Sequence, residues 1–201
     1  MKGNGLAAVQ LLAMIGAASL AVSWAEPARL AVPLTPDQRD LYAAFLDLHV
    51  SAFKKFAGSS PALINLATTI TPLDLGHQLK ENKGCLSGIT FDRLNPARKQ
   101  ILTLDSTLVS GRELRLVDSV EQSAIREAII HNAPRAIVGN TTLDANLVQL
   151  SEIAFDKTRR FAVISYAFSC GNLCGEGRMV VFEKSGNGWK EADRSCIGWI
   201  S

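Results

Sequence analysis

Residues 147–201 carry the strongest structural pattern of the chain and read LVQLSEIAFDKTRRFAVISYAFSCGNLCGEGRMVVFEKSGNGWKEADRSCIGWIS. Three apolar, β-prone runs in it each end in a turn signal, and a weaker fourth run closes the stretch. Three of the four cysteines of the chain also lie here. The pattern predicts an antiparallel meander that carries a short cysteine-closed loop between its second and third strands.

The strands of this meander are expected to follow the apolar runs. Residues 161–168 are apolar on both faces, which is typical of a central strand covered on both sides. In 148–155 the alternation slips by one residue near Ser151, which predicts a β-bulge. The other strands are expected over 179–183 and from Trp189 onward, after the tight turn at 186–188. The apolar residues 196–200 at the end of this last strand predict that the chain end docks into the core.

Two helices are expected before the meander. Thr35, Pro36 and Gln38 predict a capping box at the start of a helix over 35–57, and a second box at 119–122 predicts a helix to about residue 132. The first helix carries an apolar stripe at Leu41, Phe45, Leu48, Ala52 and Phe56. We expect both helices to pack on one face of an antiparallel sheet, which makes the fold class α+β.

The segments between these helices and the meander give weaker signals. Residues 62–70 and 113–117 predict strands, and 88–94 and 101–109 are further strand candidates. A short helix is expected within 73–85. Residues 134–146 are interpreted as a loop.

The beginning of the chain has the pattern of an export signal. In 1–25 one basic residue, Lys2, precedes an apolar run that ends in Ser23-Trp24-Ala25, which predicts a cleaved signal peptide, with retention as an anchor as the alternative. Residues 26–34 are interpreted as a linker and 35–201 as a single domain. Localisation is therefore expected to be periplasmic or secreted, without stable membrane insertion after cleavage.

Charge excludes one class of partner. Removing 1–25 takes away one of the 21 basic residues and none of the 19 acidic ones, so the mature net charge is 20 − 19 = +1. A near-neutral chain has no electrostatic basis for binding nucleic acid. The expected partner is an envelope or extracellular protein.

Four cysteines in an exported chain predict two disulfides. Three pairings are possible, and we favour Cys170–Cys174 with Cys85–Cys196. The chain-entropy relation gives about 2 kcal/mol for the five-residue ring and about 5 kcal/mol for the long one. The long bridge is therefore expected to stabilise the fold and the short one to hold a loop in shape.

Parts of the meander also resemble a known family. The residues concerned are Leu150 to Asp156, Cys170 to Gly177, Glu183-Lys184, Gly188-Trp189-Lys190 and Trp199-Ile200-Ser201. They look like a C-terminal pattern of uncharacterised exported bacterial proteins. The resemblance covers about the last quarter of the chain, and it implies an exported module with a shared C-terminal sheet. It transfers no catalytic residue, because no activity is established for that family.

The loop at 170–177 is the main candidate for function. Its three glycines permit backbone conformations closed to other residues, and a disulfide would stiffen it. One interpretation is a recognition or inhibitory loop that presents Asn172, Leu173, Glu176 and Arg178 outward. The other is a disulfide-pinned turn that only keeps two strands in register.

No catalytic residue, metal ligand or cofactor follows from motifs. The chain contains no G-x-S-x-G, H-E-x-x-H or phosphate-loop pattern, and His49, His77 and His131 do not share a ligand spacing. The leading hypothesis is a non-enzymatic binding or inhibitory module. The alternatives are a hydrolase whose site assembles only in three dimensions, from His77 or His131 with a carboxylate or thiol, and a purely structural periplasmic protein.

Overall fold

A computed structural model describes residues 31–58, 61–91, 101–171, 173–186 and 188–201. The expected signal peptide, Asn172 and Asn187 lie outside these residues. The helices are α1 (Pro36–Phe56), α2 (Leu75–Glu81), the 3₁₀ helix η1 (Ser106–Leu108) and α3 (Ser119–Ile130). The strands before the meander are β1 (Ala31–Val32), β2 (Ile64–Ala67), β3 (Ile101–Leu102), β4 (Leu114–Val117), β5 (Arg135–Val138) and β6 (Thr141–Asp144). Those of the meander are β7 (Leu147–Leu150), β8 (Ala154–Phe155), β9 (Phe161–Gly171), β10 (Cys174–Ser185), β11 (Gly188–Glu191) and β12 (Gly198–Ile200).

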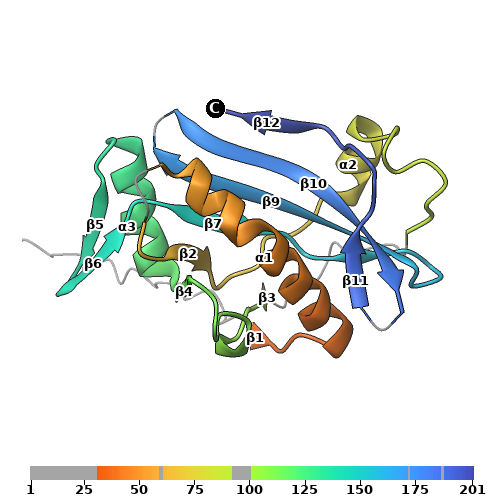
Figure 1. Ribbon diagram of the computed structural model, residues 1–201, viewed down its shortest axis with the longest axis horizontal. Coiled ribbons are helices and arrows are strands. Elements are labelled where there is room, and N and C mark those ends of the chain that lie inside the picture. The colour runs from red at the N-terminus through yellow and green to blue at the C-terminus, as the bar shows by residue number, and fades with distance from the viewer. Residues whose placement is uncertain (1–30, 59–60, 92–100, 172, 187) are drawn as a thin grey trace, which may run out of the picture.

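The fold is α+β, but its main sheet is mixed rather than antiparallel. The strand order is β11-β10-β9-β7-β2-β4, with β12 beside β10 (Figure 1). The short strand β8 pairs with β9. The meander from β7 to β11 is antiparallel, as predicted, whereas β2 runs parallel to both β4 and β7. The parallel half follows from the connections: long segments, one of them containing α3, join these strands and allow them to run in the same direction. All four residues of β2 are buried, as in parallel strands covered on both faces.

The two long helices lie on opposite faces of the sheet, so the expectation that both pack on one face is wrong. Leu66 of β2 belongs to the apolar cluster under α1, and its neighbour Ala67 belongs to the cluster under α3. Successive side chains of a strand point to opposite faces, and here both are apolar. The sheet therefore needs cover on both sides. α1 crosses one face, while α3 and α2 lie near opposite ends of the sheet (Figure 1).

Helix α1 begins as predicted but buries a different stripe. Thr35 is the N-cap, its side chain and Gln38 form the capping box, and Pro36 is the first helical residue. Leu48 is 51% exposed and Phe56 37% exposed, so the second half of the predicted stripe faces solvent. The buried positions of the helix are Gln38, Leu41, Tyr42, Phe45, Leu46, His49 and Phe53. His49 thus takes the place that the sequence assigned to Leu48.

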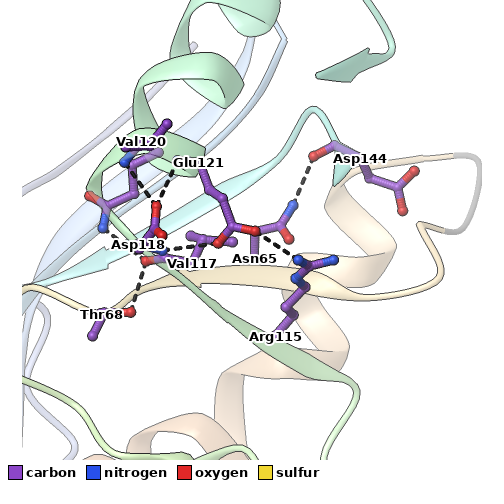
Figure 2. A network of polar contacts seen from close by, with 9 residues as sticks. Asn65, Thr68, Arg115, Val117, Asp118, Val120, Glu121 and Asp144 are labelled. Atoms are coloured by element: carbon purple, nitrogen blue, oxygen red, sulfur yellow. Dashed lines mark hydrogen bonds and ion pairs between the residues drawn. The ribbon is translucent and has the colours of Figure 1, made fainter. Parts of the chain in front are cut away.

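A polar network joins α3 to the parallel strands. The N-cap is Asp118, one residue before the predicted Ser119, because its carboxylate accepts hydrogen bonds from both Val120 N and Glu121 N at 2.9 Å. Glu121 closes the capping box and also accepts from Arg115 Nη2 of β4 at 2.7 Å (Figure 2). On β2, the buried Asn65 donates through Nδ2 to the Asp144 carbonyl at 2.8 Å. These contacts fix α3 and the end of β6 against β2 and β4.

The meander contains the predicted irregularity. Between the pairs Leu150↔Tyr166 and Ala154↔Val163, four residues advance on one side and three on the other, which separates β7 from β8. Ser151 fills this break: its N–H donates to the Ser165 carbonyl and its Oγ accepts from Ser165 N, both at 2.8 Å.

Two upstream segments differ from their interpretation. Residues 134–146, expected as a loop, contain the antiparallel hairpin of β5 and β6. Of the expected linker 26–34, the structure describes 31–34: Ala31 and Val32 pair with β3, and Leu34 is buried in the core under α1. These four residues are therefore part of the folded unit. None of the helices in the described part of the chain has the length and apolarity needed to cross a bilayer.

Candidate functional site

Both favoured disulfides are present. Cys170–Cys174 closes the hairpin between β9 and β10, and Cys85–Cys196 joins the segment after α2 to the segment before β12, each with its Cα atoms 5.1 Å apart. All four cysteines are paired, so no thiol is free to act as a nucleophile. The cysteine-closed loop of the sequence analysis is confirmed as a hairpin end.

The loop candidates do not share one location. Leu173 lies inside the Cys170–Cys174 ring and is 85% exposed. Glu176 and Arg178 lie beyond the ring on β10 and are half-buried, rather than presented at the hairpin tip. The two residues are two positions apart on a strand, so they share the face that α1 covers. Asn172 lies outside the described residues.

Glu176 and Arg178 belong to a polar group beneath α1. Tyr166 Oη donates to Glu176 Oε1 at 3.0 Å, and Arg178 Nη2 donates to Glu191 Oε1 of β11 at 3.1 Å. Burial, assisted by the Glu176 carboxylate, raises the pKa of Tyr166 to about 12, so the phenol stays a neutral donor. Both half-buried charged groups, Glu176 and Arg178, therefore already have hydrogen-bond partners within the fold.

His49 completes this group, and the sequence indicated it only as a packing residue at the helix boundary. Its ring stacks on Phe45 with 4.5 Å between centroids, and its Nε2 lies 3.3 Å from Glu191 Oε2. The two groups are close enough for an ion pair but are not aligned for a hydrogen bond, which leaves Nε2 buried without one. Desolvation lowers the pKa of His49; Glu191 opposes this shift and Arg178 adds to it.

Two of the loop glycines allow another side chain to lie close to the backbone, and only one has an unusual backbone angle. Of the three, only Gly171 has a positive φ, at 156°. A Cβ on Gly175 would lie 3.1 Å from Trp199 Cζ3, and one on Gly177 would lie 2.5 Å from Trp199 Nε1. The indole of Trp199 therefore lies against the sheet in a space that only glycine leaves open. This contact between residues far apart in the sequence had no local signal.

The final strand lies at the sheet edge, so the prediction that it docks into the core is wrong. β12 pairs with the first half of β10, and Trp199 and Ile200 are 48% and 77% exposed. The preceding segment is anchored near α2: Ile197 N donates to Asn82 Oδ1 at 2.8 Å, beside the Cys85–Cys196 bridge. The bridge and this hydrogen bond direct β12 back along β10.

Three exposed apolar residues lie where the ends of α1, the disulfide hairpin and β12 come close to one another. We call this surface the apolar end; it consists of Phe56, Leu173 and Ile200. Cys174 Sγ lies 3.7 Å from the Phe56 carbonyl oxygen, and Ile200 is paired with Glu176, two residues beyond Cys174. The sequence pointed to Leu173 through the cysteine spacing, but it placed Phe56 in a buried stripe and Ile200 in the core.

The other histidines do not assemble a recognisable reaction centre. His77 is exposed on α2, and His131 Nε2 lies 3.5 Å from Glu127 Oε2 with both side chains more than 70% exposed. Within the described residues, no group of three or more His, Cys, Asp or Glu side chains is placed to hold a metal ion. Comparison with models of known protein families, with characterised proteins and with solved structures finds no match for this chain.

Proposed function

We propose that this protein is an exported binding module that recognises an envelope or extracellular protein through the apolar end. The observation that carries the proposal is the exposure of Leu173 at 85% and of Ile200 at 77% beside Phe56 at 37%. Exposed apolar residues that gather at one end of a molecule favour a surface that another protein covers. Half-buried polar residues border them on the α1 face of β10, where Glu176 already accepts from Tyr166.

A disulfide and backbone hydrogen bonds restrain the apolar end, which favours binding. The Cys170–Cys174 bridge closes the chain around Leu173, and Ser201 exchanges two backbone hydrogen bonds with Gly175, at 2.9 and 3.2 Å, next to Ile200. A surface ordered before binding loses less conformational entropy when a partner attaches. This is the role that the sequence analysis assigned to a stiff displayed loop, now with Leu173 as its main contact.

Export is supported by the signal-like pattern of residues 1–25 and by two disulfides. A periplasmic or secreted location is where both bridges would persist. N-terminal sequencing of the protein recovered from the periplasm or medium, together with free-thiol counting, tests this. Cleavage near Ala25 and no reactive thiol are expected, whereas an intact N-terminus in a cytoplasmic fraction would contradict export.

The binding proposal is tested with two serine variants of similar exposure. Leu173→Ser removes the most exposed side chain of the apolar end, and Ile137→Ser removes a 74% exposed side chain that lies outside the apolar end, on the hairpin of β5 and β6. The wild type is used to capture envelope proteins after chemical cross-linking. We expect a cross-linked species that Leu173→Ser loses and Ile137→Ser retains. Equal capture by both variants would refute the apolar end as the binding surface.

A further inference from the structure

The face of the sheet opposite α1 carries a groove of about 370 Å³ that the proposed function does not use. On this face one apolar cluster lies under α3 and another lies near α2, around Leu73, Cys85 and Leu86. The groove lies over the meander strands and beside the start of α2. Residues that line it include Asp74, Gln78, Gln149, Ser165, Ala167 and Trp199.

One row of residues across four strands places the indole at this groove. Gln149 of β7 pairs with Ala167 of β9, Ala167 with Gly177 of β10, and Gly177 with Trp199 of β12. Directly opposed residues point to the same face, so all four positions share the face away from α1. Because Gly177 has no Cβ, the indole lies against the sheet there, with 48% of the residue exposed. Trp199 thus offers a flat aromatic surface at the groove wall.

Several other side chains of the groove carry hydrogen-bonding groups. Gln149 and Ser165 are half-buried on the sheet, and Gln78 is half-buried on α2. Asp74 caps α2 through Oδ1, which accepts from His77 N at 3.0 Å, and its Oδ2 makes no hydrogen bond within the described residues. Amide, hydroxyl and carboxylate groups therefore converge beside the indole.

The charge of the lining selects the class of ligand. The lining residues include one carboxylate, Asp74, and neither lysine nor arginine. Phosphorylated or carboxylated ligands would meet a negative charge with no cation to pair with it. A ligand that suits the groove is neutral, rich in hydroxyl groups and has a flat apolar face for the indole. A pyranose sugar ring has all three properties.

We propose that this groove binds a neutral saccharide, with one sugar ring stacked on Trp199 and its hydroxyl groups hydrogen-bonded to Gln149, Ser165 and Asp74. Ligand sites of this kind combine an apolar wall with a few placed polar groups. The site lies on the face opposite Glu176 and Ile200 of β10 and β12, so it is independent of the apolar end.

The test is calorimetric titration of the full mature chain with chitotetraose, cellotetraose and maltotetraose. At least one is expected to bind saturably. Trp199→Leu should weaken that binding about tenfold or more, and Gln149→Ala about fivefold, as the loss of a stacking surface and of one hydrogen bond implies. Trp189→Phe is the matched control, because Trp189 is buried against Phe155 on the α1 side and should leave affinity unchanged.

A second readout guards against misfolding of the Trp199 variant. In the wild type, the NMR signal of the Trp199 indole N–H should shift on titration, while that of Trp189 stays in place. Absence of saturable binding to all three sugars would overturn the proposal, as would equal affinity in the wild type and Gln149→Ala together with an unmoved Trp199 signal. Saturable binding of trialanine instead of the sugars would replace the saccharide by a peptide and equally refute it.

Discussion

The two faces of the central sheet are built in different ways. Under α1, the rings of Phe45, Phe53 and Phe168 are fully buried in one continuous apolar cluster. On the other face the apolar residues divide into two smaller clusters, one under α3 and one near α2, and the Trp199 groove is lined by polar and apolar residues together. One face is thus a packed core, and the other relies on a covalent bridge and on glycine to shape an accessible surface.

The difference shows where stability and function can be separated. Apolar burial is the dominant favourable contribution to folding, and the cluster under α1 is the largest of the three among the described residues, so changes there are expected to act on the whole molecule. The groove and the apolar end contribute little buried area. Substitutions of their exposed side chains are therefore expected to change ligand binding more than stability. Substitutions on the two faces are therefore expected to differ in how strongly they destabilise the fold.

Removing the Cys85–Cys196 bridge should cost the most. The Cys85→Ala/Cys196→Ala double variant is expected to lose about 5 kcal/mol of unfolding free energy, because the bridge closes a loop over a sequence separation of 111. The Cys170→Ala/Cys174→Ala variant should lose only about 2 kcal/mol. Denaturant unfolding under non-reducing conditions measures both. Equal losses of unfolding free energy in the two variants would contradict a special role of the Cys85–Cys196 bridge in holding the face opposite α1.

On the α1 face, Phe53→Ala should destabilise the fold by about 4 kcal/mol, since it opens a cavity among buried rings. Phe53 is fully buried, with its ring 4.9 Å from that of Phe168. Phe56→Ala, on the same helix but 37% exposed, is the control and should cost less than about 1 kcal/mol. Thermal and denaturant unfolding measure the stability of both variants. A similar loss of stability in the two would contradict the description of the α1 face as a packed core.

Gly177→Ala should cost about 2 kcal/mol, because the new Cβ would overlap both Trp199 and the backbone. That atom would lie 2.5 Å from Trp199 Nε1 and 2.8 Å from the Tyr166 carbonyl oxygen. Gly84→Ala is the control, since nothing lies within 4 Å of its Cβ position. The indole N–H signal of Trp199 should move in the first variant alone. An unmoved signal with unchanged stability would mean that Gly177 does not position the indole.

Local signals predicted the parts of the fold that local interactions specify. Thr35 and Gln38 are three residues apart, and their capping box forms as expected. The meander and the Cys170–Cys174 hairpin follow from alternation, turns and close cysteine spacing. The parallel pairing of β2 and the opposite placement of α3 depend on long connections, whose path a single sequence does not specify.

The candidate sites were less predictable, because contacts between residues far apart in the sequence determine which side chains are buried and which are exposed. Leu48 and His49 are neighbours on α1, yet His49 is buried, stacked on Phe45, and Leu48 faces solvent. Trp199 and Gly177 are likewise brought together only by the pairing of β12 with β10. A histidine near a helix stripe and a glycine in a strand indicate a close approach, but not the partner.

The smallest expected effect is a change in the pH dependence of stability, caused by His49. Burial is the largest influence on its pKa and lowers it below the ordinary value, although Glu191 at 3.3 Å opposes the shift. The unfolded chain therefore binds a proton at this residue at a higher pH than the folded chain does. As the pH falls through about 6.5, the unfolded state gains protons first, and the free energy of unfolding decreases.

Replacing His49 with Phe should remove this component of the pH dependence. The difference in slope between the wild type and His49→Phe cannot exceed about 1.4 kcal/mol per pH unit, the limit for one proton. Denaturant unfolding from pH 7.5 to pH 5 measures it. His131→Gln is the control, since that side chain is 74% exposed and its ion-pair distance to Glu127 is 3.5 Å. An unchanged slope in His49→Phe would contradict this prediction. So would a His49-dependent rise in stability as the pH falls, because attraction to Glu191 would then outweigh the effect of burial on the pKa.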